Sequence, residues 1–144
     1  MFGALSISGT AVTPGGNLGC KWIVHTNTPA WDMEYQEEYF EGKVNSKQML
    51  EFTVLNCLYT AKNILAKSVA LPPMSIGAKG FPIKDCAEAM IRSCFAFATL
   101  KPSHTNCINH DERGHLETIK IMITDNSVLK EFQSVAKKAI CNYV

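Results

Sequence analysis

A glycine-containing stretch in the middle of the chain has the composition of an anion-binding loop. It runs from Ser75 to Phe81 and lies between an apolar segment and an amphipathic one. A turn that presents several backbone N–H groups just before a helix is suited to hold a phosphate, because the helix N-terminus carries partial positive charge. Glycines let the main chain approach a ligand without a Cβ, and a serine adds a hydroxyl donor. The predicted phosphate and ribose loop consists of Ser75, Ile76, Gly77, Ala78, Lys79, Gly80 and Phe81.

The same stretch also has a purely structural interpretation. Glycines and prolines make tight turns between a strand and a helix, and Pro82 suits a helix start. Short glycine motifs occur often without any ligand. The residues of this stretch alone leave both interpretations open.

Histidines and a cysteine in one polar connection form a second candidate site. Their spacing, His-x2-Cys-x2-His-x4-His, is close to that of zinc sites, although zinc ligands usually come from two separated pairs. We expect no metal and no other cofactor. The weak candidate ligands are His104, Cys107, His110 and His115.

The sequence contains no convincing catalytic set. His25 and Asn27 follow an apolar run and have the types of acid/base and orienting groups, but a hydrogen-bonded histidine at a strand end is the favoured interpretation. No Ser-His-Asp or Cys-His arrangement stands out. We predict no catalytic residue and favour a binding protein over an enzyme.

Composition and charge restrict the class of protein. The 144 residues suit one domain, and 14 basic residues against 13 acidic ones give a net charge of +1. Such a balance argues against direct binding of nucleic acid or of a membrane surface. We find no signal peptide and no spanning segment, so we expect an intracellular protein of the nucleus or cytoplasm with free thiols at its six cysteines.

Apolar periodicity predicts alternating strands and helices. Short apolar or alternating runs predict strands around residues 4–8, 10–13, 22–24, 68–71 and 117–124. Spacings of three and four predict helices over about 46–66, 83–98 and 128–140, the last capped by Asn126 or Ser127. This order is typical of parallel strands with helical crossovers, whose ligands sit beyond the carboxyl ends of the strands. The acidic segment from Asp32 to Glu41 is expected to be a solvated connection or a short helix.

Three quoted stretches resemble one family in its own order. They are GTAVTPGGNLGCKWIVHTNTPAW from Gly9, VLNCLYTAKNILAKSVALPPMSIGAKGFPIKDCAEAMIRSC from Val54, and TIKIMITDNSVLKEFQ from Thr118. Together they resemble the macro domain, and especially the macro domain attached to a variant histone, in which a strand ends in His-x-Asn-x-Pro-x-Trp. Here that motif is His25, Asn27, Pro29 and Trp31.

The resemblance implies a fold, a ligand and further site residues. It implies an α/β class, with a three-layer α/β/α arrangement around a mixed sheet, and recognition of ADP-ribose or of an ADP-ribosylated protein. The loop would hold the diphosphate, while Thr124 and Asp125 would lie on the adenine side. Some members hydrolyse ADP-ribosyl linkages, and hydrolysis is an alternative. A third possibility is a non-binding fold that serves as a protein-interaction or dimerisation module in chromatin.

The resemblance covers only the later part of the family pattern. The strands and first helix that carry an adenine-binding acid, a ribose-binding asparagine and a first glycine loop have no counterpart in residues 1–144. Lys79 stands where many members have an aromatic residue or asparagine beside the distal ribose, and Thr124 stands where some have an aromatic residue that stacks on adenine. We therefore predict a single, truncated domain with weakened or lost affinity, whose uncovered sheet edges favour a homo-oligomer.

Overall fold

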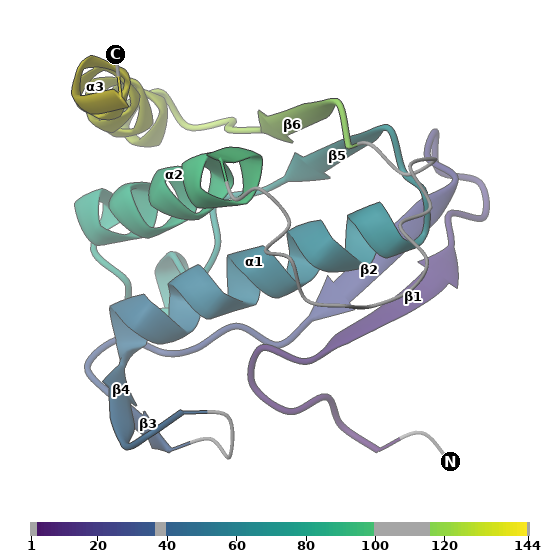
Figure 1. The fold of residues 1–144 in the computed structure, drawn as a ribbon, viewed down its shortest axis with the longest axis horizontal. Helices are drawn as coiled ribbons and strands as arrows, with labels where there is room; N and C mark the ends of the chain where they lie inside the picture. Colours follow the sequence, from purple (N-terminus) through teal and green to yellow (C-terminus); the bar gives the residue numbers. More distant parts are fainter. Residues whose placement is uncertain (1–2, 37–39, 100–115, 144) are drawn as a thin grey trace.

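The computed structural model of the chain describes residues 3–36, 40–99 and 116–143. Four strands precede the first helix of the described chain, and from that helix onward helices and strands alternate (Figure 1). The elements are β1 (Thr10–Pro14), β2 (Trp22–Thr26), β3 (Glu34–Gln36), β4 (Lys43–Asn45), α1 (Ser46–Asn63), β5 (Ser68–Leu71), the short 3-10 turn η1 (Gly77–Lys79), α2 (Ile83–Thr99), β6 (Thr118–Ile121) and α3 (Asn126–Tyr143).

The strands pair both parallel and antiparallel, in agreement with the mixed character that the resemblance implied, whereas the alternation of strands and helices alone indicated parallel pairing. β5 and β6 are parallel and are joined through α2, as predicted. β1 and β2 are antiparallel, because the short connection between Pro14 and Trp22 has room for a tight turn and none for a crossover helix. The strand predicted around residues 4–8 is reduced to one bridge between Ile7 and Asn27.

The acidic connection forms a hairpin instead of the expected irregular segment or short helix. β3 and β4 are antiparallel, with Tyr35 opposite Val44. Tyr35 alternates with exposed Glu34 and Gln36, so one face of this strand points inward. Its hydroxyl accepts a hydrogen bond from the Ala30 amide at 2.8 Å. Because most side chains of this segment are acidic or polar, the sequence shows no apolar alternation that would predict the short strand.

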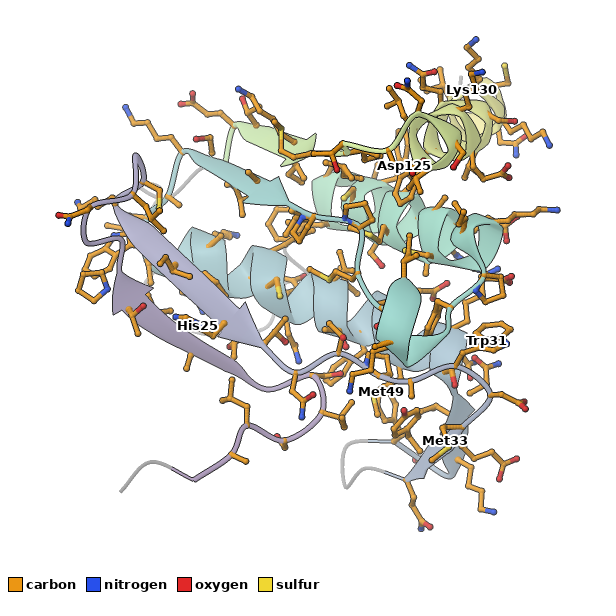
Figure 2. The ribbon with its side chains drawn as sticks, turned by 180° about the vertical axis from the view of Figure 1, so that it is seen from behind. His25, Trp31, Met33, Met49, Asp125 and Lys130 are labelled. Carbon is orange, nitrogen blue, oxygen red and sulfur yellow. The ribbon has the colours of Figure 1, made fainter. Side chains whose placement is uncertain are left out.

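Apolar faces of the helices supply the core, as their spacing predicts. α1 and α2 lie side by side over the same face of the strands (Figures 1 and 2), and α3 packs against α2. The fully buried centre includes Leu50, Val54, Leu58, Cys86, Ala87 and Met90. An Asn45 and Gln48 capping box starts α1, and each of these side chains accepts a hydrogen bond from the other residue's backbone N–H. In the described part of the chain, none of the helices is long and apolar enough to cross a membrane.

Each sheet of the described residues has only two strands, so every strand, β5 and β2 included, has one edge without a partner strand. The carbonyls of Lys67 and Leu71 accept bonds from the β6 side, so the alternation of a ladder turns Ser68 and Ala70 of β5 away from β6. The Gly15 amide donates to the Lys21 carbonyl on the side of β2 that faces β1. Because backbone groups alternate in direction along a strand, every second residue of β2 points its N–H and C=O away from β1. The free edges of β5 and β2 are therefore open to a further strand.

The described cysteines are free thiols, as predicted. Burial raises the pKa of Cys86 and of Cys94 to about 11 and also raises that of Cys57. These thiols are protonated at neutral pH and act as small apolar side chains of the core.

Candidate functional site

The loop between β5 and α2 has the left-handed backbone that its glycines predict. Gly77 and Gly80 have φ angles of 82° and 77°, and Ser75 shares this region at 63° although it is not a glycine. The Gly80 amide donates to the Gly77 carbonyl at 2.9 Å, and the Phe81 amide donates to the Ser75 carbonyl at 3.0 Å. These bonds close the loop upon itself around η1.

Three predicted loop residues hold the loop against the segment that follows β2. The Ser75 hydroxyl donates to the Pro29 carbonyl at 2.7 Å, which uses its one hydrogen within the protein. The Trp31 amide donates to the Lys79 carbonyl at 2.8 Å. Phe81 is buried, and its ring meets the Trp31 ring edge to face, with centroids 5.0 Å apart. The ligand contacts predicted for Ser75 and Phe81 remain predictions, whereas their structural role is observed.

The backbone amides at the start of η1 are available to donate hydrogen bonds to a ligand. The N–H groups of Ile76, Gly77 and Ala78 precede the first hydrogen bond of the 3-10 turn, and they donate to no other group of the described chain. A Cβ added at Gly77 would meet open space within 4 Å. Lys79 is exposed beside these amides. The loop can therefore present three donors and a cation to an anionic oxygen.

Thr124 and Asp125 follow β6, the strand paired with β5. Because parallel strands end at the same edge of a sheet, both predicted segments lie beyond the carboxyl edge of this pair (Figure 2). Asp125 accepts hydrogen bonds from the amides of Ser127 and Val128 at 2.8 and 3.1 Å, so it is Asp125 that caps α3 and not Asn126 or Ser127 as expected. The Ser127 hydroxyl, at 2.5 Å, and these two amides hold the pKa of Asp125 below its usual value.

A pocket that the sequence did not indicate adjoins the loop through Trp31. Its volume is about 380 Å³, and its walls are the segment after β2 and the start of α1. The lining residues are Trp31, Asp32, Met33, Glu34, Asn45, Ser46 and Lys47. We call it the Trp31 pocket. Trp31 was recognised in the sequence as part of a motif, but nothing in the motif showed that its side chain is 36 % exposed beside a cavity.

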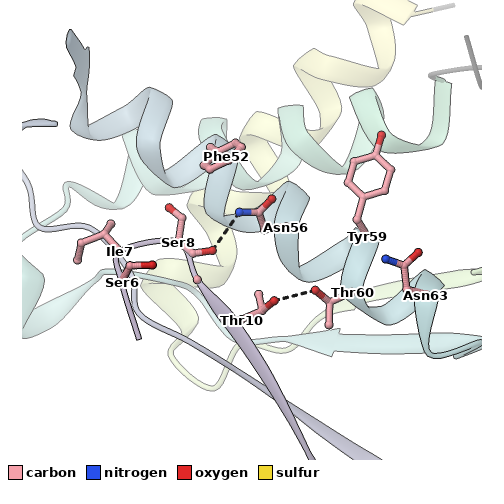
Figure 3. Close-up of a pocket in the computed structure, with 10 residues that line it drawn as sticks. Ser6, Ile7, Ser8, Thr10, Phe52, Asn56, Tyr59, Thr60 and Asn63 are labelled. Carbon is pink, nitrogen blue, oxygen red and sulfur yellow. Dashed lines mark hydrogen bonds between the residues drawn. The ribbon is translucent and has the colours of Figure 1, made fainter. Parts of the chain in front are cut away.

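A second pocket, of about 510 Å³, lies between the start of the chain and α1 (Figure 3). Its polar groups bond largely to one another: Thr10 pairs with Thr60 at 2.9 Å, and Asn56 donates to the Ser8 carbonyl at 3.0 Å. No charged side chain lines it, and it shares no residue with the loop. This pocket is therefore poorly suited to a phosphate.

The other candidates from the sequence do not form a site in the described chain. His104, Cys107, His110 and His115 lie outside the described residues. Within residues 3–36, 40–99 and 116–143, no group of three or more His, Cys, Asp and Glu side chains is placed to hold a metal. His25 pairs with the Thr13 hydroxyl at 2.9 Å, in agreement with the structural interpretation.

Comparison with known families identifies the fold. A family model of the macro domain matches residues 3–90, which are 88 of the 144 residues. The chain belongs to the macro domain family. The matched part of this macro domain includes the loop from Ser75 to Phe81 and ends before Thr124 and Asp125. The resemblance and the α/β fold class inferred from the sequence are thereby confirmed.

Individual relatives share the fold over most of this macro domain. The O-acetyl-ADP-ribose deacetylase of Salmonella typhimurium is 32 % identical over 88 residues, which cover 61 % of this chain and 45 % of that protein. An uncharacterized protein of Sulfurisphaera tokodaii is 27 % identical over 139 residues, 96 % of this chain and 64 % of its own. The Oceanobacillus iheyensis macrodomain, solved with ADP, superposes with a TM-score of 0.74 at 20 % identity, covering 96 % of this chain and 62 % of that one. The chain thus spans less than two thirds of the length of each.

Capping by Asp125 predicts a specific pattern of stability. Asp125→Ala removes the acceptor for two helix amides and is expected to lower the melting temperature, whereas Asp125→Asn keeps an equally good cap and most of the stability. Because folding lowers the pKa of Asp125, its contribution is present above the ordinary value of 3.8 and is lost as pH falls through the lowered pKa. Thermal denaturation followed by circular dichroism at pH 7 and at pH 2 measures both effects. Identical melting temperatures for the three proteins at pH 7 would contradict the assignment.

Proposed function

We propose that this macro domain recognises ADP-ribose or a related nucleotide, with the diphosphate on the amides of Ile76, Gly77 and Ala78. The observation that carries the proposal is that these three donors have no partner in the described chain, while the bonds at Ser75, Gly80 and Phe81 use the polar groups on the rest of the loop. Free N–H groups of successive residues in a turn favour an anion, and Gly77 supplies the left-handed position of this turn. Lys79 adds a positive charge beside them.

Relatives support the ligand class. The deacetylase from Salmonella typhimurium is named for O-acetyl-ADP-ribose, and the Oceanobacillus iheyensis macrodomain was solved with ADP. Both compounds contain the adenosine diphosphate group. An ADP-ribosylated protein presents the same group to the loop and is the corresponding macromolecular partner.

The proposed affinity is weak compared with a complete nucleotide site. Thr124 offers no aromatic ring for adenine, and the loss of base stacking costs about 1–3 kcal/mol. One loop also supplies fewer converging polar groups than small-molecule sites usually have. We therefore expect binding that depends strongly on the diphosphate.

Binding is favoured over hydrolysis by the state of two nearby carboxylates. Asp125 is engaged with the first amides of α3, and Asp85, in the first turn of α2, pairs with Lys47 at 3.5 Å. A carboxylate held in this way is poorly placed to activate water. The proposal therefore assigns no catalytic residue.

Paired substitutions at Gly77 test the diphosphate site. Asp and Asn both tolerate a left-handed backbone, and the space beside Gly77 is open, so Gly77→Asp and Gly77→Asn should fold alike. Titration calorimetry with ADP-ribose is expected to show binding by wild type, weaker binding by Gly77→Asn and none by Gly77→Asp, because only the carboxylate repels phosphate. Equal affinities of the two variants, or no heat from folded wild type, would refute the proposal.

The free edges of β5 and β2 favour a second function, as a module that associates with another copy of itself. An unpaired strand edge is a template for backbone pairing. Ala70 is exposed, and its N–H faces away from β6. A second copy that adds a strand there would satisfy these groups.

Proline at the β5 edge tests self-association. Ala70→Pro removes an N–H that faces outward, and Ala70→Val keeps it at the same position. Native mass spectrometry is expected to show dimers of wild type and of Ala70→Val and monomers of Ala70→Pro. Monomeric wild type at every concentration, or dimers of Ala70→Pro, would exclude this edge.

A further inference from the structure

The Trp31 pocket has preformed walls. The buried Ser46 hydroxyl accepts a hydrogen bond from the Met33 amide at 2.8 Å and donates to the Met33 carbonyl at 2.9 Å. The opposite wall is fixed through Trp31, whose amide and ring are tied to the loop at Lys79 and Phe81. Both walls are therefore held by bonds that do not depend on a ligand.

Aromatic and sulfur groups line the pocket and remain accessible. Trp31 is 36 % exposed and Met33 is 53 % exposed. Figure 2 shows both side chains at the same end of the molecule. An exposed indole face attracts cations through its quadrupole, and a thioether adapts to the stem of a long side chain. This combination fits a flexible aliphatic chain that ends in a positive charge.

The charges around the pocket favour a cation. Asp32 and Glu34 supply carboxylates. Among the described residues Glu34 pairs with Lys43, in a bridge whose Lys43 and Glu34 side chains are 66 % and 70 % exposed and which is therefore weak. Lys47 is the one cation among the lining residues.

The positive charge of Lys47 is already balanced. It forms bridges to Asp85 at 3.5 Å and to Glu88. Burial works against the charge of Lys47, but the hydrogen bonds and the negative charges of these carboxylates outweigh it and raise its pKa. Lys47 therefore does not neutralise Asp32, which has no ion pair among the described residues, or Glu34, whose exposed bridge to Lys43 can exchange for another cation.

We propose that the Trp31 pocket binds a Lys or Arg side chain of an extended peptide. The proposal rests on the proposed function in one respect, since the peptide would be the one that carries the ADP-ribose held by the loop. Trp31 connects the two sites because its amide bonds to the Lys79 carbonyl. A basic residue close to the modified position would then lie over the indole, with its charge between Asp32 and Glu34.

Two unmodified peptides test the pocket without ADP-ribose. One contains a single Arg flanked by glycines, and the other has Gln in its place, both with a fluorescent label. Fluorescence anisotropy is expected to show binding of the Arg peptide that weakens as salt is added, and no binding of the Gln peptide. Equal binding of both peptides would overturn the proposal.

Neutral variants locate the binding in the pocket. Asp32 has a left-handed φ of 57°, which asparagine tolerates, so the double variant Asp32→Asn with Glu34→Gln should keep the fold. It is expected to bind the Arg peptide roughly three- to tenfold more weakly than wild type. Glu41→Gln is the matched control, since it removes an exposed acid of the same connection outside the pocket. Unchanged affinity in the double variant, or an equal loss in Glu41→Gln, would overturn the proposal; should the double variant melt early, Glu34→Gln alone gives the same decision.

The outcomes separate this proposal from the proposed function. Free ADP-ribose is expected to bind the double variant as it binds wild type, because the substituted carboxylates do not belong to the loop. If the Arg peptide binds and ADP-ribose does not, the proposal that the pocket binds a basic side chain stands, but its connection with ADP-ribose fails. If ADP-ribose binds and the Arg peptide does not, the proposal for the Trp31 pocket is refuted and the proposed function stands.

Discussion

The attachment of the Ser75–Phe81 loop to the Pro29–Trp31 segment is the constraint on which the proposed site depends. Two hydrogen bonds, from Ser75 to Pro29 and from Trp31 to Lys79, and one pair of aromatic rings make this attachment. The groups that face Pro29 and Trp31 are used within the protein, so the amides of Ile76, Gly77 and Ala78 remain as donors. The left-handed backbone at Gly77 and Gly80 is the local condition that permits this arrangement.

The same attachment relates two binding regions. On the loop side it leaves free amides for an anion, and on the other side it fixes the indole of Trp31 as a wall of the pocket beneath β3 and β4. The proposed anion site and the proposed cation site therefore share one structural element. This arrangement suits a ligand that carries phosphates and a nearby basic side chain, and a modified protein segment has both.

Much of this fold could be predicted from the sequence, because periodic apolar residues determine helices and buried strands. The three helices, β5 and the glycine loop follow from spacing and turn chemistry. The β3 and β4 hairpin was missed because only Tyr35 and Val44 face inward, too few for a visible alternation. The pairing of Ser75 with Pro29 was also beyond sequence reasoning, since 46 positions separate them. The start of α1 at Ser46 was predicted correctly, and the Asn45 and Gln48 spacing is a capping-box signal that agrees with it.

The central claim is that the free amides of the loop bind a diphosphate, and backbone NMR tests it most directly. In a nitrogen-15 labelled sample, titration with ADP-ribose is predicted to shift the amide signals of Ile76, Gly77 and Ala78 most strongly and to leave those of Thr10 and Thr60 in the uncharged pocket unchanged. Shifts confined to the uncharged pocket, or no shifts at saturating ADP-ribose, would contradict the account.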